Sequence, residues 1–294
     1  MNKSTLATLA ALVGYSIWGF SFLFSKIALG MATPFVLLAY RYVLAFLIMN
    51  LLVLSGRVKV SLRGKPVGKL LLMGFVMPVC YFIFETYGID MTTSSYSGII
   101  LSLIPVAGLI TGLIFLKEKC TLFQIACTMA SIVGVILTTT GGIGTVSILG
   151  TVLLVGGAVA TALFNTISRS ISDLFTPFER TYVMFALGSV VFVLIAVVQN
   201  RGELSVLTSP AAEPMFWVAV LYLAAAASVC AFMLVNYAVT YLSVAKTTIF
   251  NNFSTVVSVL GGIFIMKDSF TPTQIVGIVV ILLGVFGVSW KKDK

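Results

Sequence analysis

Two charged residues stand inside long apolar stretches of the sequence and could do chemistry there. Arg41 lies about eight residues into the stretch 33–55, and Glu85 lies about four residues before the end of the stretch 69–89. A charge among apolar residues is costly unless it faces protein or a water-filled cavity. We therefore predict a structural ion pair between Arg41 and Glu85, with Lys26 as the alternative partner of Glu85. Glu85 is also a candidate for binding an amine or for carrying a proton.

Polar side chains in other apolar stretches form a second group of candidates for substrate binding. Amides in membrane helices also hydrogen-bond to neighbouring helices, so a scaffold role is the alternative for each of them. The candidates of this group are Ser102, Asn165, Asn236, Asn251 and Asn252.

Aromatic residues follow one face of the first apolar stretch. Tyr15, Trp18 and Phe22, followed by Lys26, recur at spacings of three and four residues, which places their side chains on one side of a helix. Such a stripe is typical of helix packing, and it is also typical of the wall of a site for an amphipathic ligand. The three aromatic residues are therefore candidate substrate-binding residues.

The sequence offers no group of residues for catalysis or for metal binding. It contains no histidine, and its four cysteines have no paired spacing. Hydrolytic chemistry needs a nucleophile with its base or a metal cluster, and Glu85 is the only carboxylate well inside an apolar stretch. The phosphate-binding motif GxxxxGK[ST] does not occur either. We therefore expect no enzymatic activity, no cofactor, no metal and no direct use of ATP.

Helices that cross a membrane must position these residues. The chain is 60% hydrophobic and 9% charged, whereas soluble domains carry roughly 25% charged residues. A helical span needs about 20 mostly apolar residues. The sequence thus predicts an all-α polytopic membrane protein with an uncleaved N-terminal helix. Its ten transmembrane helices are expected at residues 5–27, 33–55, 69–89, 93–116, 121–140, 147–168, 178–199, 214–240, 245–266 and 271–290.

Basic residues gather at alternate ends of these stretches. With the N-terminus inside the cell, fourteen Lys and Arg residues, Arg180 among them, fall on the inner side and three on the outer side. Such a bias sets the orientation by the positive-inside rule. Both termini are therefore predicted to be cytoplasmic, in a protein of the plasma membrane. The basic segment 57–69 is interpreted as a topology signal, with a lipid site as the alternative, and we expect no nucleic-acid partner.

Part of the sequence occurs twice. LKEKCTLFQI at 116–125 returns as MKDSFTPTQI at 266–275, and TPF at 33–35 returns at 176–178. The offsets of 150 and 143 residues indicate two related halves, predicted as 1–143 and 144–294. Five spans per half is an odd number, so the second half crosses the membrane upside down. Inverted repeats are typical of transporters whose site lies between the halves.

These motifs resemble a known family. LIPVAGLITGLIFLKEK, followed by FQIACTMASIVGVIL, resembles the EamA-type transporters of the drug/metabolite transporter superfamily, and WGFSFLFSK and YRYVLAFL resemble their first two spans. The resemblance implies a helical bundle whose central cavity is lined mainly by spans 1, 3, 4, 6, 8 and 9. It places the candidate aromatic, amide and carboxylate side chains on cavity helices. Thr255 stands where the family often has a proline matching Pro105, and span 1 lacks the acidic residue of the small multidrug members.

The function we expect is secondary-active transport of a small organic metabolite by alternating access. An amino acid or a related amphiphile is the expected substrate, the resemblance favours export, and Glu85 is the candidate proton-coupling residue. The alternatives are a carrier of sugar phosphates or nucleotide sugars, and a membrane protein without transport activity. The expected partners are the small-molecule substrate and the lipid bilayer. The oligomeric state is open, and a monomer is compatible with the sequence.

Overall fold

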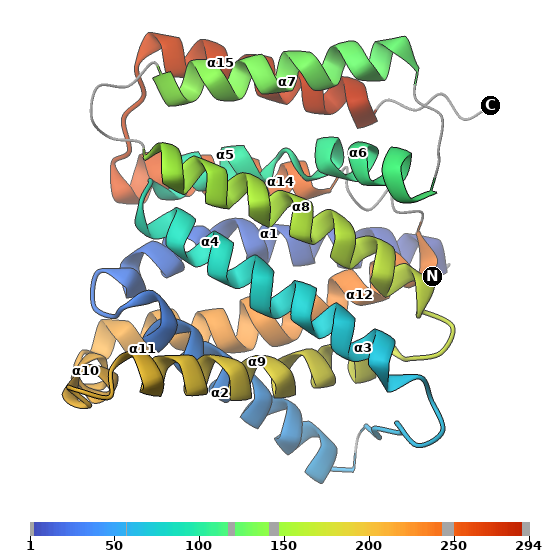
Figure 1. Cartoon of the computed structure of the whole chain (residues 1–294), viewed down its shortest axis with the longest axis vertical. Helices are drawn as coiled ribbons and strands as arrows, with labels where there is room; N and C mark the ends of the chain where they lie inside the picture. Colours follow the sequence, from blue (N-terminus) through green and yellow to red (C-terminus); the bar gives the residue numbers. More distant parts are fainter. Residues whose placement is uncertain (1–2, 57, 117–120, 141–146, 243–249, 290–294) are drawn as a thin grey trace.

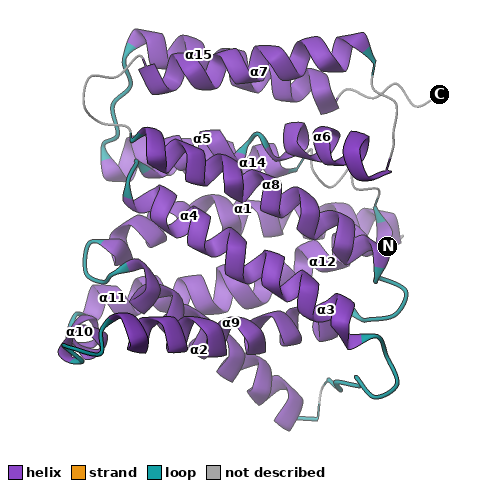
Figure 2. Cartoon of the chain, viewed as in Figure 1, coloured by secondary structure: helices purple, strands orange, loops and turns teal. Residues whose placement is uncertain are grey.

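The chain is known from a computed structural model that describes residues 3–56, 58–116, 121–140, 147–242 and 250–289. The described residues form helices and connecting loops without any strand (Figure 2), which confirms the all-α class. The elements are α1 Lys3–Leu29, α2 Pro34–Leu54, α3 Val67–Gly74, η1 Phe75–Cys80, α4 Tyr81–Asp90, α5 Ser94–Leu101, α6 Ile104–Leu116, α7 Leu122–Thr140, α8 Ile148–Ser170, α9 Pro177–Gln199, α10 Ser205–Thr208, η2 Ser209–Ala212, α11 Pro214–Leu221, η3 Tyr222–Cys230, α12 Ala231–Tyr241, α14 Asn251–Gly261, η4 Gly262–Met266 and α15 Pro272–Ser289.

Most predicted spans appear as helices that could cross a bilayer. In the described part of the chain, seven helical segments are long and apolar enough to do so, and they coincide with the predicted spans 1 to 4 and 6 to 8. Three shorter apolar helices, Leu122–Leu137, Ser254–Met266 and Pro272–Gly287, lie within the other predicted spans. The protein is thus a polytopic integral membrane protein. The count of ten crossings stays a prediction.

The repeated TPF sequence marks the start of the second helix in each predicted half. α2 begins at Pro34 after Thr33, and α9 begins at Pro177 after Thr176. Proline is favoured at a first helical position, where its missing N–H would have no partner anyway. In α9 a capping box adds to this, because Thr176 Oγ1 accepts from the backbone N–H of Glu179 at 3.2 Å and the Glu179 carboxylate accepts from the Thr176 N–H at 2.9 Å.

Two predicted spans are interrupted near their centres by proline. In the third span, η1 joins α3 to α4, and Met77 has extended backbone angles (φ −140°, ψ 115°) next to Pro78. In the fourth span, α5 ends at Leu101 and α6 begins at Ile104, just before Pro105. A proline inside a helix removes one hydrogen bond and clashes with the preceding turn. Both spans were predicted as continuous helices, and residues at both breaks line the interior cavity.

Helices far apart in the sequence pack together in a reciprocal pattern (Figure 1). α1 packs on α12 and α14, whereas α8 packs on α4, α5 and α6. α2 packs on α9, and α7 packs on α15 in a layer at the edge of the bundle. The first helix of each predicted half therefore contacts the third and fourth spans of the other half. The boundary between residues 143 and 144 stays a prediction.

A pair of glycines brings α7 and α15 close together. A Cβ atom on Gly134 would lie 2.8 Å from the carbonyl oxygen of Gly277, and one on Gly284 would lie 2.6 Å from the carbonyl oxygen of Cys127. Gly284 follows Gly134 by 150 residues, and Gly277 follows Cys127 by the same number. The contact is therefore reciprocal, and small residues let the two backbones approach.

The bundle has two ends, which we name by the segments they carry. The basic-loop end carries residues 58–66, the start of α1 and the end of α15, at the right of Figure 1. The α10 end carries α10 and η2, at the left of Figure 1. The first and the last described helices thus begin and end on one side of the bundle.

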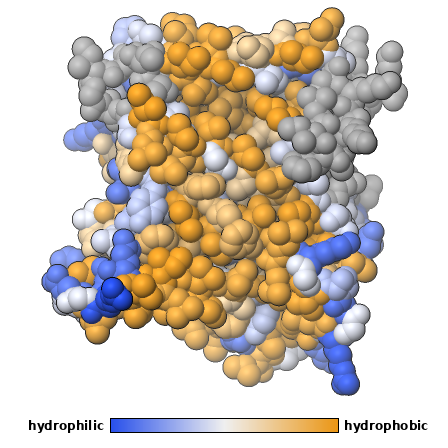
Figure 3. Space-filling model, viewed as in Figure 1, coloured by the Kyte–Doolittle hydropathy of each residue, from blue (hydrophilic) through white to orange (hydrophobic). Residues whose placement is uncertain are grey.

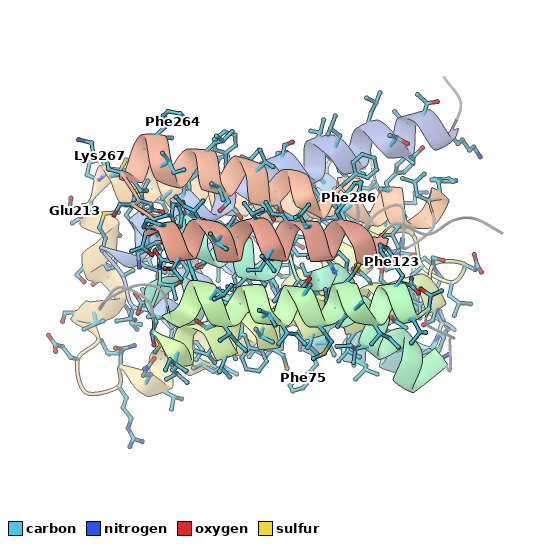
Figure 4. The ribbon with its side chains drawn as sticks, turned by 90° about the horizontal axis from the view of Figure 1, so that it is seen from above. Phe75, Phe123, Glu213, Phe264, Lys267 and Phe286 are labelled. Atoms are coloured by element: carbon cyan, nitrogen blue, oxygen red, sulfur yellow. The ribbon has the colours of Figure 1, made fainter. Side chains whose placement is uncertain are left out.

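The surface between the two ends is apolar. Figure 3 shows hydrophobic side chains across the middle of one face, with hydrophilic residues gathered toward the two ends. Figure 4 shows Phe75 and Phe264 at opposite edges of the bundle, pointing outward. These two side chains, together with Phe123 and Phe286, are each more than half exposed. An apolar surface that covers the middle of the molecule is unfavourable in water and favourable against lipid chains.

Candidate functional site

A cavity of about 30 Å³ lies in the interior of the bundle, with room for about one water molecule. Its walls come from α1, α2, η1, α4, α5, α6, α8, α12 and α14, so seven of the ten predicted spans contribute. The lining combines an aromatic wall with one cation and one carboxylate. The lining residues are Trp18, Ser21, Phe22, Arg41, Met77, Tyr81, Phe82, Glu85, Leu101, Ile104, Thr161, Phe232 and Ser254.

The cavity lies where the two predicted halves meet. Thr161 follows Trp18 by 143 residues, and Phe232 follows Phe82 by 150 residues, the two offsets of the sequence repeat. Ser254 likewise follows Ile104 by 150 residues. Three pairs of matching positions therefore line the same cavity. Phenylalanine recurs at positions 82 and 232, at the repeat offset of 150 residues. This recurrence is the sequence signal that could have identified Phe82 and Phe232 as site residues.

Arg41 is buried at the cavity and is held by two contacts. Its Nε donates to Ser228 Oγ at 2.9 Å, and its guanidinium carbon lies 4.4 Å from the centre of the Phe82 ring. Ser228 belongs to η3, a π-helical segment of the kind that often occurs at functional sites. Among the described residues, the two terminal nitrogens of Arg41 have no hydrogen-bond partner.

The ion pair predicted for Arg41 is not formed in this structure. Glu85 lines the same cavity, but its Oε1 accepts from the Tyr81 hydroxyl at 2.8 Å. Lys26, the alternative predicted partner of Glu85, donates to backbone carbonyls at the α10 end. The ion pair found among the described residues joins Lys65 to a different carboxylate, at 2.9 Å. The sequence could not show this, because Ser228 and Phe82 compete for the guanidinium only in the folded chain.

Glu85 presents one free carboxylate oxygen. The side chain is 4% exposed, and Tyr81, one helical turn earlier on α4, holds its Oε1. Among the described residues, Oε2 has no hydrogen-bond partner. The cavity therefore contains a cation and a carboxylate that are each held in place and each partly unsatisfied.

The aromatic stripe of α1 divides into a lining part and a packing part. Trp18 and Phe22 line the cavity, and Trp18 Nε1 donates to the carbonyl of Ala227 at 2.9 Å. The Trp18 ring also packs edge-on against Phe232, with ring centres 4.9 Å apart. Tyr15 packs behind Trp18, with ring centres 5.2 Å apart, and lies in the apolar contact between α1 and α12.

The predicted amides do not converge on the cavity. Asn236 is buried in a hydrogen-bonded group, where its amide nitrogen donates to Thr181 Oγ1 at 3.0 Å. Asn165 is buried on α8 outside the cavity lining. Ser102 is also buried outside the lining, and its hydroxyl donates to the carbonyl of Ile99 at 2.6 Å. The side chains of Asn251 and Asn252 lie outside the described residues.

The backbone carbonyl of Asn236 accepts from Arg180, which was predicted from the sequence to be a cytoplasmic topology charge. Arg180 is fully buried at the basic-loop end, not exposed as a topology charge. Its terminal nitrogens donate to the Ser168 hydroxyl at 2.7 Å, the Thr240 hydroxyl at 2.9 Å and the Asn236 carbonyl at 3.2 Å. These bonds join α9 to α8 and α12. Arg180 lies three residues after the helix-starting Pro177, and its partners are known only from the tertiary structure.

Close packing covers the cavity toward the α10 end. Ser258 Oγ donates to the carbonyl of Ser94 at 2.9 Å, and Thr255 Oγ1 donates to the carbonyl of Gly98 at 3.2 Å, so α14 is tied to α5. A Cβ atom on Gly98 would lie 2.6 Å from Ser258 Cβ and 3.8 Å from the ring of Phe22. This α5–α14 contact therefore adjoins the cavity wall directly.

Lys26 ties α1 to the third span at the same end. Its Nζ donates to the carbonyls of Ile89, Asp90 and Thr92 at 2.8, 2.8 and 2.6 Å. The carbonyls at the end of a helix lack partners within the helix and favour a cation. The last member of the aromatic stripe thus closes the α10 end and does not line the cavity.

A larger hollow of about 370 Å³ lies at the α10 end between the α1–α2 loop and the α10–η2 segment. It is formed by loop residues and helix termini, and Asp90 is its only charged lining residue. The described residues contain no group of three or more His, Cys, Asp or Glu side chains that could hold a metal ion. We therefore take the interior cavity, with its opposed charges and aromatic wall, as the candidate site.

Comparisons with known proteins place the chain in a family. A sequence model of the EamA-like transporter family matches residues 5–140 and 148–290. The chain is 34% identical over 298 residues to the uncharacterized transporter YcxC of Bacillus subtilis (strain 168), an alignment that covers 100% of this chain and 96% of that protein. It is 21% identical over 280 residues to an uncharacterized transporter of Archaeoglobus fulgidus, covering 94% and 96% of the two chains.

A solved crystal structure has the same fold. It superposes with a TM-score of 0.66 at 17% sequence identity, and the match covers 96% of this chain and 95% of the other. The family match agrees with the resemblance seen in the motifs around Pro105 and in the first two spans. Since the family model covers nearly the whole chain in two consecutive segments, the chain belongs to the EamA-like transporter family.

Proposed function

We propose that the protein is a secondary-active transporter that moves a small amphipathic metabolite, an amino acid or a close relative, by alternating access. The observation that carries this proposal is the composition of the interior cavity. Trp18, Phe22 and Phe232 provide an apolar wall, and Arg41 and Glu85 provide opposite charges. Ligand sites typically combine a mostly apolar lining with a few placed polar groups.

The position of the cavity supports alternating access. It lies between matching positions of two related halves, which is where transporters built from inverted repeats bind their substrates. Sites for drug-sized molecules measure about 300–1,000 Å³, whereas this cavity measures about 30 Å³. In the proposed cycle this structure is the contracted state, and the helices part from it to admit a solute. The α5–α14 contact at the α10 end is the proposed barrier on that side.

The proposed orientation places both termini in the cytoplasm of a cell whose plasma membrane holds the protein. The first and last described helices begin and end at the basic-loop end, which also carries Lys59, Arg63 and Lys65. Positive charge favours the cytoplasmic side. Under this proposal the α10 end faces outward. The direction of net transport is proposed to be export, and Glu85 is proposed to couple it to protons.

The test is counterflow in proteoliposomes that contain the purified protein. We expect saturable exchange of a subset of labelled amino acids, and faster net movement when a pH gradient is imposed. A Glu85→Gln variant should keep exchange of the best substrate measurable but lose the response to the gradient. Exchange of sugar phosphates without any exchange of amino acids would refute the proposed substrate class. Exchange of no solute, with folded protein present, would refute transport.

A further inference from the structure

We propose that the cavity binds the two charged groups of a zwitterion, with Arg41 holding the carboxylate and Glu85 holding the ammonium group. The aromatic wall of Trp18, Phe22 and Phe232 then holds the apolar remainder of the same solute. This inference rests on the proposed transport function and deepens it. It assigns Arg41 to the ligand and not to the scaffold, and it narrows the substrate class to apolar α-amino acids.

Each of the two charged side chains is left partly unsatisfied on the cavity side. The terminal nitrogens of Arg41 and the Oε2 atom of Glu85 have no hydrogen-bond partner among the described residues. Both side chains are nearly inaccessible from outside, at 3% and 4% exposure. Buried charges without partners are strongly unfavourable. A bound solute that carries both complementary charges would satisfy the two groups together.

Contacts within the protein hold both charged groups in position without a ligand. Ser228 and the Phe82 ring fix the guanidinium of Arg41 through its Nε and its face, which leaves its terminal N–H groups available. Tyr81 fixes Oε1 of Glu85 and leaves Oε2 available. A guanidinium with two parallel N–H groups matches the geometry of a carboxylate. Preorganised groups of this kind lower the entropic cost of binding.

The matching positions of the second half carry no charge. In the second half, Met184 takes the position of Arg41, 143 residues later, and Val235 takes the position of Glu85, 150 residues later. Both are buried, at 0% and 2% exposure. Two apolar side chains thus serve the same helix packing in the related half. A buried charge that packing does not require indicates a role in binding.

The charge pattern also determines which solutes are excluded. An organic phosphate or a carboxylate without an amine would satisfy Arg41 but place a second negative charge in the cavity with Glu85. An amine without a carboxylate would satisfy Glu85 and leave the guanidinium unpaired. Leaving one of these groups buried without a partner should weaken the binding of such a solute by about thirtyfold or more. The zwitterion is the one ionic form that complements both side chains.

The test compares matched solutes that differ only in their charged groups. Counterflow is measured for L-leucine, L-leucinamide and 4-methylpentanoate, and for L-phenylalanine, L-phenylalaninamide and 3-phenylpropanoate, with sugar phosphates and lipophilic amines as further solutes. For at least one set, we expect the amino acid to reach half-maximal exchange at a concentration about thirtyfold lower than its amide or its deaminated acid requires. This comparison uses the unaltered protein, so it does not depend on the folding of any variant.

Two variants then test which group binds which charge. Each variant replaces a charged residue with an uncharged one, and the matching position of the other half carries an uncharged residue. Arg41→Met should abolish the preference for the amino acid over its amide, and it should keep the preference over the deaminated acid. Glu85→Gln should do the reverse. Arg41→Lys keeps the charge without the planar fork and should restore part of the preference. Monodisperse elution and an unchanged melting temperature serve as the folding controls.

The outcomes separate this inference from the proposed function. The predicted pattern of preferences supports both. If solutes exchange but an amide or a deaminated acid performs as well as its amino acid, the zwitterion site is refuted and transport stands. The same conclusion follows if both folded variants keep the full preference for the amino acid. If the folded, unaltered protein exchanges no solute of the panel, the proposed function is refuted, and the inference falls with it.

Discussion

The α5–α14 contact offers a direct test of alternating access, through the substitution Gly98→Ala. The new Cβ would lie 2.6 Å from Ser258 Cβ, whereas ordinary contacts are 3.4 Å or longer. The Cβ of Ser258 cannot rotate away, so α5 and α14 must separate by several tenths of an ångström. This separation would also lengthen the bonds from Ser258 to Ser94 and from Thr255 to the Gly98 carbonyl, which measure 2.9 and 3.2 Å.

The expected size of the effect follows from the cost of overpacking, about 1–3 kcal/mol. The gain in helix propensity from glycine to alanine, about 1 kcal/mol, applies in every folded state and cancels between them. If the contact opens during transport, the cost falls only on the contracted state. The ratio of open to contracted molecules should then rise about fivefold to 150-fold, at 1.4 kcal/mol for each factor of ten.

The assay measures the accessibility of a single cysteine, Thr161→Cys, in a background that lacks the four natural cysteines. A membrane-impermeant maleimide is added at the α10 side of oriented vesicles, and the rate of labelling is recorded. Gly98→Ala should raise this rate at least fivefold. Gly261→Ala is the matched control, since a Cβ on Gly261 would meet no atom within 4 Å. Equal rates for the two variants would refute the contact as the barrier on that side.

Three further predictions concern stability. Arg180→Lys should lower the free energy of unfolding by about 1–3 kcal/mol, because a single ammonium group cannot serve the acceptors on Ser168, Asn236 and Thr240 together. Denaturation in detergent would measure this loss, and unchanged stability would contradict the buried network. Lys26→Met should lower the free energy of unfolding by about 1 kcal/mol through the loss of a helix-end cation. The control Lys26→Arg keeps the cation and should lower the free energy of unfolding by less. Gly284→Val should lower the melting temperature through overpacking against α7 without changing substrate preference, which thermal unfolding and counterflow would check together.

Much of the architecture was predictable because the apolar composition of membrane helices identifies them in the sequence. An apolar run of about 20 residues has few alternatives in a bilayer, so the span boundaries depend on the sequence alone. The TPF repeat coincides with the starts of α2 and α9, because a proline after an N-cap position acts locally. The family assignment rested on motifs of the same kind, and the match over residues 5–140 and 148–290 confirmed it.

The site was only partly predictable, since a span boundary does not tell how a helix is rotated or which chain segments face it. Trp18, Phe22 and Glu85 were named from the sequence and line the cavity, whereas Asn236 was named and serves the Arg180 network. The difference arises from partners distant in the sequence, which periodicity cannot show.

The sequence by itself determined the all-α membrane class, the positions of most apolar helices and the family of this protein. Each of these depends on composition or on local signals that the bilayer enforces. The tertiary structure alone decided that Arg41 binds Ser228, 187 residues away, instead of a carboxylate. It also decided that Arg41 and Glu85 share one cavity with free hydrogen-bonding atoms. The physical reason is that a buried charge is satisfied by whichever groups the packing brings near, and packing is a property of the whole bundle.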